Sequence, residues 1–185
     1  MPEDLSTLWS DVVTIPDFPS PGVSFKDLSG MLANPDSLGI VVRAWADAVR
    51  LEQATMVVGI EARGFPLGGA LAYGLGCGFV SLRKAGRLPR DVHRREYTLE
   101  YGDGILEIHQ DALTANDRVI IVDDVLATGG TAAAAVDLVR ESGAYVISLA
   151  VIMDLPFLEG RRALEAKGVH VHALIDGDGT PYPHP

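Results

Sequence analysis

From Thr55 onward, short runs of β-branched apolar residues alternate with stretches in which apolar residues have helical spacing. The apolar runs predict strands at 55–60, 78–82, 105–109, 118–123, 145–153 and 169–175. The stretches between them predict helices at 64–75, 131–142 and 157–167. Alternation of this kind implies right-handed crossovers between parallel strands. It is typical of an α/β fold, a mainly parallel twisted sheet with helices on both faces.

The chain upstream of Thr55 has a different character. Residues 37–51 place their apolar side chains along one side of a predicted helix, and Trp45 among them is expected in the core. Residues 16–30 are dense in Pro and Gly, which disfavours both helix and regular strand. We expect a small N-terminal cap, or hood, at about 1–34 that covers one end of the sheet.

Two further segments lack a regular pattern. Residues 84–104 show no periodicity, and a stretch of that length without regular structure in a compact domain is usually a functional loop, so we expect a flexible lid. Residues 176–185 begin with Asp-x-Asp-Gly, as some calcium loops do, but the downstream Glu is missing and a flexible tail is expected. With these appendages, residues 1–185 are predicted to form a single domain.

Composition limits the classes of protein that fit. The chain has 185 residues, of which 15 are basic and 25 acidic, so its formal charge is 15 − 25 = −10. This charge argues against a nucleic-acid binder, which would normally be basic. No apolar run approaches the roughly 20 residues that span a bilayer, and the acidic start does not resemble a secretory signal. Cys77 is the only cysteine, which excludes an internal disulfide and a multi-cysteine zinc site. We expect a cytoplasmic protein with no membrane or nucleic-acid partner.

The strongest chemical signal is VIIVDDVLATGGT, residues 119–131. Its strand delivers Asp123 and Asp124 at the carboxyl end, where open α/β sheets bind ligands. The loop and helix start that follow offer backbone N–H groups, hydroxyl groups and partial positive charge, which suit a phosphate monoester. Carboxylates accept strong hydrogen bonds from sugar hydroxyls, so a sugar phosphate fits both halves. This predicted phosphate cradle comprises Ala127, Thr128, Gly129, Gly130 and Thr131.

Two more segments indicate an anionic ligand. VVGIEARGF, residues 57–65, repeats the plan of strand, short loop and helix, and Arg63 at the helix start can bind a phosphate with two N–H groups. Residues 83–95 hold six of the 15 basic residues and a single acid, Asp91. In a protein of negative net charge, attraction of a phosphate-rich ligand requires such a local cationic patch.

Residues just beyond that patch suit a lid. Glu100 and Tyr101 are followed by Gly102, and a carboxylate beside a glycine hinge can bring an acid–base group to a site on closing. Each of these signals also has a structural interpretation, in which the paired acids end a strand, Arg63 is an exposed side chain at a turn and the basic cluster is a solvated loop. Three of the five histidines, His109, His170 and His172, have no recognisable metal-ligand spacing, and we expect no metal site at them.

Taken together, the motifs resemble the type I phosphoribosyltransferase family. DDVLATGGT resembles the family's signature and alone indicates only the superfamily. PDFPSPG, RKAGRLP and LEYG narrow the resemblance to the adenine-specific members, in matching order from about Asp17 to Leu174. The resemblance implies purine salvage, in which the 5-phosphoribosyl group of phosphoribosyl pyrophosphate is transferred to adenine, giving AMP and pyrophosphate. It also implies Mg²⁺, bound mainly through the pyrophosphate and ribose hydroxyls of the substrate, and a homodimer.

The resemblance assigns roles to the matching positions. Asp123 and Asp124 match the pair that holds the ribose hydroxyls, and the phosphate cradle matches the 5-phosphate site. Glu100 matches the lid carboxylate expected to act as the catalytic acid–base group, and Tyr101 accompanies it. The other matches are Glu61, Ala62 and Arg63 around pyrophosphate; Arg83, Lys84 and Arg87 as cationic partners, some across a subunit interface; and Phe25, Lys26 and Val125 around adenine.

Some positions depart from the family's pattern, and rival functions stay open. Val125 stands where Leu is more usual, and Arg94 and Arg95 add positive charge to the lid with no assigned role. One rival is a phosphoribosyltransferase for 6-oxopurines. The other is a non-catalytic regulator that senses phosphoribosyl pyrophosphate. If it bound DNA, it should carry a helix-turn-helix and a basic face, and this sequence shows neither signal. The lid carboxylate would also have no purpose in a sensor.

Overall fold

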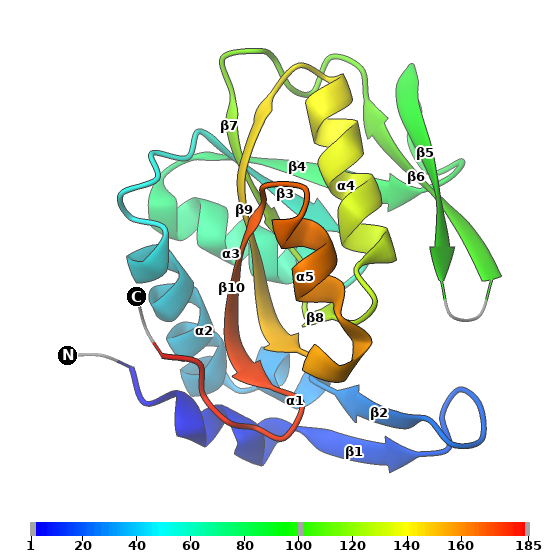
Figure 1. Ribbon diagram of the computed structural model, residues 1–185. Coiled ribbons are helices and arrows are strands. Elements are labelled where there is room, and N and C mark those ends of the chain that lie inside the picture. The colour runs from blue at the N-terminus through cyan, green and yellow to red at the C-terminus, as the bar shows by residue number, and fades with distance from the viewer. Residues whose placement is uncertain (1–2, 100–101, 184–185) are drawn as a thin grey trace.

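A central sheet organises the molecule, whose computed structural model describes residues 3–99 and 102–183. Within these residues, eight strands form the sheet: β3 (Met56–Ile60), β4 (Gly78–Lys84), β5 (Val92–Leu99), β6 (Gly102–His109), β7 (Arg118–Val122), β8 (Val125–Leu126), β9 (Tyr145–Asp154) and β10 (His170–Asp176). Their order is β10-β9-β7-β3-β4-β6-β5, and β8 pairs with β9 (Figure 1). The pairs from β10 to β4 are parallel, whereas β6 pairs antiparallel with both β4 and β5. The predicted mainly parallel α/β sheet is confirmed.

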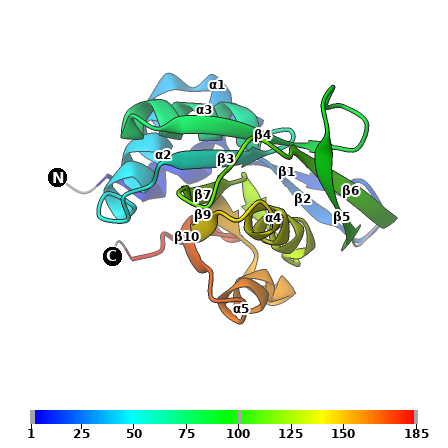
Figure 2. The same cartoon turned by 90° about the horizontal axis from the view of Figure 1, so that it is seen from above.

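Helices cover both faces of this sheet, as expected. α2 (Pro35–Ala48) and α3 (Gly64–Leu75) lie on one face, and α4 (Gly130–Glu141) and α5 (Gly160–Glu165) lie on the other (Figure 2). Successive residues of β7 therefore enter different cores: Ile121 packs on the α4 side and Ile120 on the α2 side. Trp45 is fully buried, which confirms its predicted place in the core, and its indole N–H donates to the Val151 carbonyl at 3.3 Å. None of the described helices is long and apolar enough to cross a membrane.

The hood consists of η1 (Leu5–Asp11), β1 (Val13–Pro16), β2 (Ser24–Asp27) and α1 (Ser29–Ala33). The prediction that residues 16–30 form neither helix nor strand is wrong, because β1 and β2 pair as an antiparallel hairpin and α1 begins at Ser29. Much of the Pro and Gly content lies in the loop of this hairpin, where Gly22 has φ 87° and its N–H donates to Asp17 Oδ1 at 2.7 Å. The strands are four residues long, too short to show an alternating pattern.

The predicted irregular lid is also wrong in its local structure, since β5 and β6 form a long antiparallel hairpin that packs against α4. Charged side chains of β5 form ion pairs with neighbouring elements, and for this reason the strand does not show the alternation of apolar and polar residues that predicts a strand. Arg94 contacts the buried carboxylate of Glu107 at 2.7 Å, and Arg95 contacts Glu141 of α4 at 2.8 Å. These contacts give a structural role to the two basic residues that the sequence left unassigned.

The C-terminal part differs from expectation at two places. Residues 157–167 do not form one helix. Glu159, with φ 57°, leaves the helical conformation and separates η2 (Pro156–Leu158) from α5. The tail is not a flexible segment over residues 176–183. There the Asp176 carboxylate accepts the N–H groups of Asp178 and Thr180, both at 2.9 Å, and closes a turn. The Tyr182 N–H then donates to the Leu174 carbonyl at 2.9 Å.

Candidate active site

The carboxyl end of β7 carries the two adjacent acids. Asp123 is half-buried and Asp124 is 5% exposed, and the Asp124 N–H donates to Asp123 Oδ1 at 2.9 Å. Burial and the negative charge of Asp124 raise the pKa of Asp123 well above its ordinary range, and Arg63 offsets this only in part. A cation or a set of hydroxyl donors placed here would relieve the repulsion between the two carboxylates.

The phosphate cradle follows at once. The short β8 carries the chain along β9, Gly129 turns it with φ 84°, and α4 begins at Gly130. The turn and the start of α4 border a cavity of about 90 Å³. Backbone N–H groups at a helix start attract anions, and the cavity has the size of a small group rather than a whole nucleotide. The lining includes Asp123, Val125, Ala127, Thr128, Gly129, Gly130 and Thr131, so the structure brings the predicted cradle together with the first acid.

Arg63 links the second acid to the hood. It stands between β3 and α3, where its Nε donates to Asp124 Oδ2, and its guanidinium lies 5.9 Å from the ring centroid of Phe25 in β2. The turn lies close to β7 because the next residue is Gly64, on which a Cβ atom would come within 2.5 Å of the Val122 carbonyl oxygen. Close backbone packing thus sets Arg63 beside Asp124.

Glu61 gathers two of the predicted cations. Its carboxylate, which is 7% exposed, accepts Arg87 at 2.6 Å, Arg83 at 3.4 Å and the Lys84 backbone N–H at 2.9 Å. Burial raises the pKa of Glu61, but this N–H group and the charges of Arg87 and Arg83 outweigh it and hold the pKa below its ordinary value. The Lys84 side chain and Ala62 are exposed in the same region.

The basic residues at 83–95 do not form one patch, which corrects the expectation from their sequence density. Arg83 and Arg87 face Glu61, whereas Arg94 and Arg95 are engaged along the hairpin. Arg90 pairs with Asp111 near the far end of the hairpin. The charge count along the sequence could not reveal these partners, because they come from other strands and from α4.

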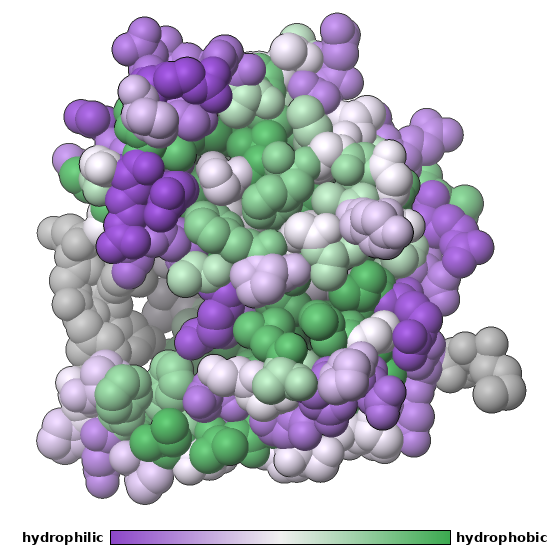
Figure 3. All heavy atoms as spheres, turned by 180° about the vertical axis from the view of Figure 1, so that it is seen from behind, coloured by the Kyte–Doolittle hydropathy of each residue, from purple (hydrophilic) through white to green (hydrophobic). Residues whose placement is uncertain are grey.

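The predicted adenine-side residues lie in the hood and beside the acids. Phe25 stacks edge-on against Phe18, with ring centroids 5.2 Å apart. The Lys26 side chain belongs to the hood hairpin, where Nζ donates to Thr14 Oγ1 at 3.0 Å. Val125 is half-buried in β8. Seen from behind, the surface is hollowed between the hood and the body of the sheet (Figure 3).

Sequence reasoning missed one residue of this region, Tyr97 of β5. Its side chain lies beside that of Thr131, and burial and the charge of Asp123 raise its pKa. Gly104 of β6 makes room for it, because a Cβ there would lie 2.5 Å from the Tyr97 ring. Tyr97 is the first residue of the YTLEYG segment, in which sequence reasoning assigned roles only to Glu100 and Tyr101. Those two residues lie outside the described part of the chain.

The acids also fit a metal that arrives with a substrate. In residues 3–99 and 102–183, no group of three or more His, Cys, Asp or Glu side chains is arranged to hold a metal ion. Mg²⁺ is commonly bound by one or two carboxylates together with substrate phosphates. Asp123 and Asp124 supply two adjacent carboxylates whose mutual repulsion such an ion would relieve.

Comparison with known proteins identifies the class that this fold and site define. The sequence model of a family described as phosphoribosyl transferase domain matches residues 29–176. The adenine phosphoribosyltransferase of Streptomyces coelicolor is 50% identical over 170 residues, covering 91% of this chain and 93% of that protein. The chain therefore belongs to the phosphoribosyltransferases, and among them to the adenine phosphoribosyltransferase family.

Solved structures agree with this placement. Adenine phosphoribosyltransferase from Rhodothermus marinus superposes with a TM-score of 0.87 at 45% identity, covering 93% of this chain and 97% of that one. The enzyme from Giardia lamblia, in complex with 9-deazaadenine, superposes with a TM-score of 0.90 at 38% identity, with 94% and 97% covered. The type I phosphoribosyltransferase fold expected from the motifs is thus confirmed.

Proposed function

We propose that the protein transfers the 5-phosphoribosyl group of phosphoribosyl pyrophosphate to adenine, releasing pyrophosphate and forming AMP for purine salvage. The observation that carries this proposal is the grouping of three features: Asp123 lines the cavity of the phosphate cradle, and its neighbour Asp124 accepts a hydrogen bond from Arg63. Membership of the adenine phosphoribosyltransferase family and the adenine analogue in the Giardia relative support adenine as the base.

The proposed chemistry follows the charges of the site. Displacing pyrophosphate from the anomeric carbon develops positive charge on the ribose and negative charge on the leaving group. Asp123 and Asp124 stabilise the first, and Arg63, Arg83 and Arg87 stabilise the second. The arginines can exchange their internal partners for pyrophosphate oxygens, since the side chains of Arg63 and Arg87 are 38% and 54% exposed.

The acid–base role is assigned to Glu100. When a ring nitrogen of adenine forms its bond to the anomeric carbon, that base loses a proton, and a carboxylate on a closing lid can accept it. Closure would also exclude water, which competes with adenine as the nucleophile. We propose that the β5–β6 hairpin carries this lid and that Tyr101 closes with it.

Mg²⁺ completes the proposed site. The acid pair would hold it together with the ribose hydroxyls and pyrophosphate of the substrate, and the ion would supply positive charge that stabilises the leaving group. We further propose a homodimer, which the exposed aromatic side chains of Tyr73 and Phe79 on neighbouring elements support. The free thiol of Cys77 supports a cytoplasmic location.

The decisive experiment is base competition. Purified protein with phosphoribosyl pyrophosphate, Mg²⁺ and an equal mixture of adenine, hypoxanthine and guanine should release pyrophosphate and form AMP in excess over IMP and GMP. A preference for hypoxanthine or guanine would favour the 6-oxopurine alternative and overturn adenine as the base. Binding of phosphoribosyl pyrophosphate with no turnover of any base would favour the sensor.

A further inference from the structure

One buried carboxylate outside the active site collects partners from three parts of the chain. Asp154 ends β9 and is fully buried, and it pairs in register with Leu126, the residue just before the phosphate cradle. Arg161 of α5 donates from Nε to Asp154 Oδ2 at 2.7 Å, and Tyr182 of the tail donates its hydroxyl to the same oxygen at 3.1 Å. Asp154 therefore ties α5 and the tail to β9.

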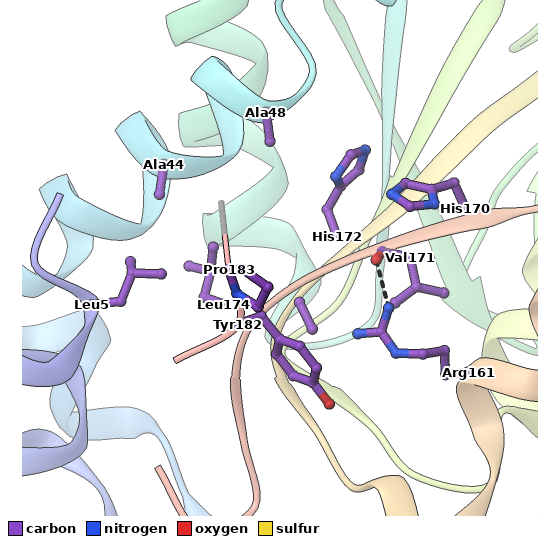
Figure 4. A pocket seen from close by; sticks show the side chains of 11 residues that line it. Leu5, Ala44, Ala48, Arg161, His170, Val171, His172, Leu174, Tyr182 and Pro183 are labelled. Carbon is purple, nitrogen blue, oxygen red and sulfur yellow. Dashed lines mark hydrogen bonds between the residues drawn. The ribbon is translucent and has the colours of Figure 1, made fainter. Parts of the chain in front are cut away.

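These contacts hold Arg161 in one orientation. Its Nη1 donates to the Val171 carbonyl at 2.9 Å, and its guanidinium lies 4.7 Å from the Tyr182 ring centroid (Figure 4). Within the described residues, Asp154 Oδ1 and Arg161 Nη2 are buried without a hydrogen-bond partner. The bonds that the two side chains do form must therefore offset the free-energy cost of removing both charged groups from water. Burial and the charge of Asp154 raise the pKa of Tyr182 above its ordinary value.

The start of α5 in turn touches the phosphate cradle. Gly160 precedes Arg161, and a Cβ atom on it would lie 2.1 Å from the Ala127 carbonyl oxygen and 2.9 Å from the Gly129 nitrogen. This is contact between two backbones, with no side chain between them to absorb a shift. Because close-packed interiors transmit displacements, a shift of Gly160 would displace the backbone of Ala127 and Gly129.

We propose that Asp154, Arg161 and Tyr182 are positioning residues for the 5-phosphate, a unit that we call the Asp154 latch. The latch holds α5 against the phosphate cradle and so keeps the cradle's N–H groups aimed at the monoester. This inference rests on the proposed function, since it takes the cradle as the 5-phosphate site. It gives the C-terminal tail a part in substrate affinity, although in the described chain none of the three latch residues lines the cradle's cavity.

The test separates the two anionic ends of the substrate. Ribose 5-phosphate reports on the cradle, and pyrophosphate reports on the Arg63 side, so each is titrated calorimetrically into wild type, Tyr182→Phe and Arg161→Lys. We expect Tyr182→Phe to weaken the binding of ribose 5-phosphate about fivefold, at the lower end of the usual coupling between two sites, and Arg161→Lys to weaken it more than about tenfold. Pyrophosphate affinity should stay within about twofold in both variants.

Matched controls come from the same elements and residue types. Arg162→Lys alters the neighbouring arginine, whose side chain is 83% exposed, and Tyr145→Phe alters a tyrosine that is 61% exposed. Both should bind the two ligands as wild type does. In turnover, the latch variants should raise the KM for phosphoribosyl pyrophosphate while the KM for adenine stays constant.

The outcomes distinguish the latch from the proposed function. If wild type binds ribose 5-phosphate and both latch variants bind it equally well, the latch is wrong and the proposed function stands. Equal weakening of both ligands would indicate general destabilisation and would also overturn the latch. Failure of wild type to bind ribose 5-phosphate would overturn the proposed function itself. Should Arg161→Lys fail to fold, Tyr182→Phe decides, because it keeps the ring over Arg161.

Discussion

Replacing Asp123 by Asn should make the protein more stable and less able to bind its substrate. Asn keeps the oxygen that accepts the Asp124 N–H at 2.9 Å, so the local geometry is retained and only the charge is removed. Burial and the charge of Asp124 raise the pKa of Asp123, which means that the ionised form is disfavoured in the folded state. Removing that charge should raise the free energy of unfolding by about 0.5–2 kcal/mol at pH 8.

The gain should depend on pH with a definite sign. A carboxyl group whose pKa is higher in the folded state than in the unfolded state binds its proton more tightly when folded, so it lowers stability as pH rises. The difference between Asp123→Asn and wild type should therefore be small near pH 4, the ordinary pKa of an aspartate, and should grow as pH rises. Urea unfolding at several pH values measures this difference, with the exposed Asp91→Asn as a control of equal charge change.

The same substitution should weaken the binding of the substrate. A hydrogen bond to a charged group contributes about 1.5–3 kcal/mol, so losing the carboxylate at the ribose hydroxyls should weaken phosphoribosyl pyrophosphate by about 10- to 100-fold in the presence of Mg²⁺. A variant that is no more stable than wild type at any pH, or that binds phosphoribosyl pyrophosphate normally, would refute the reasoning.

Three other substitutions test separate parts of the account. Glu100→Gln should lower the rate constant of the chemical step, measured in single-turnover assays, by about 10²–10⁴-fold, and a loss below about threefold would remove its acid–base role. Gly64→Ala would set a methyl group 2.5 Å from a carbonyl oxygen of β7 and should cost about 1–3 kcal/mol in urea unfolding, whereas Gly69→Ala, with open space around it, should cost nothing. Burial raises the pKa of Glu52, but hydrogen bonds led by that from His172 outweigh it and hold the pKa below its ordinary value. Glu52→Gln should therefore lower stability by about 1 kcal/mol at pH 7, and this loss should disappear as pH falls below about 4; a loss independent of pH would contradict this.

Much of the sheet could be predicted because its strands are buried on both faces. The apolar run that ends at Val122 has no polar interruption, because its side chains point alternately into the two cores on either face of the sheet. The sequence pattern and the strand therefore coincide. The phosphate cradle was predictable for a related reason. Its residues are consecutive in the chain, and backbone N–H groups bind the anion with little need for distant partners.

The elements that were mispredicted depend on partners far away in the sequence. Arg94 and Arg95 looked like spare lid cations, yet their partners lie on β6 and α4. The tail appeared flexible because the contact of Tyr182 with Asp154 joins residues 28 positions apart. Pattern reasoning detects burial along one element, whereas these segments are held by single ion pairs and hydrogen bonds between elements.

The central claim is that one corner of the sheet holds the sugar phosphate, and a crystal structure with Mg²⁺ and phosphoribosyl pyrophosphate tests it most directly. The account predicts density for the 5-phosphate against the N–H groups of residues 127–131, with the ribose hydroxyls on Asp123 and Asp124 and the pyrophosphate beside Arg63. Density for the sugar at any other corner of the sheet, with the turn before α4 free of ligand, would contradict it.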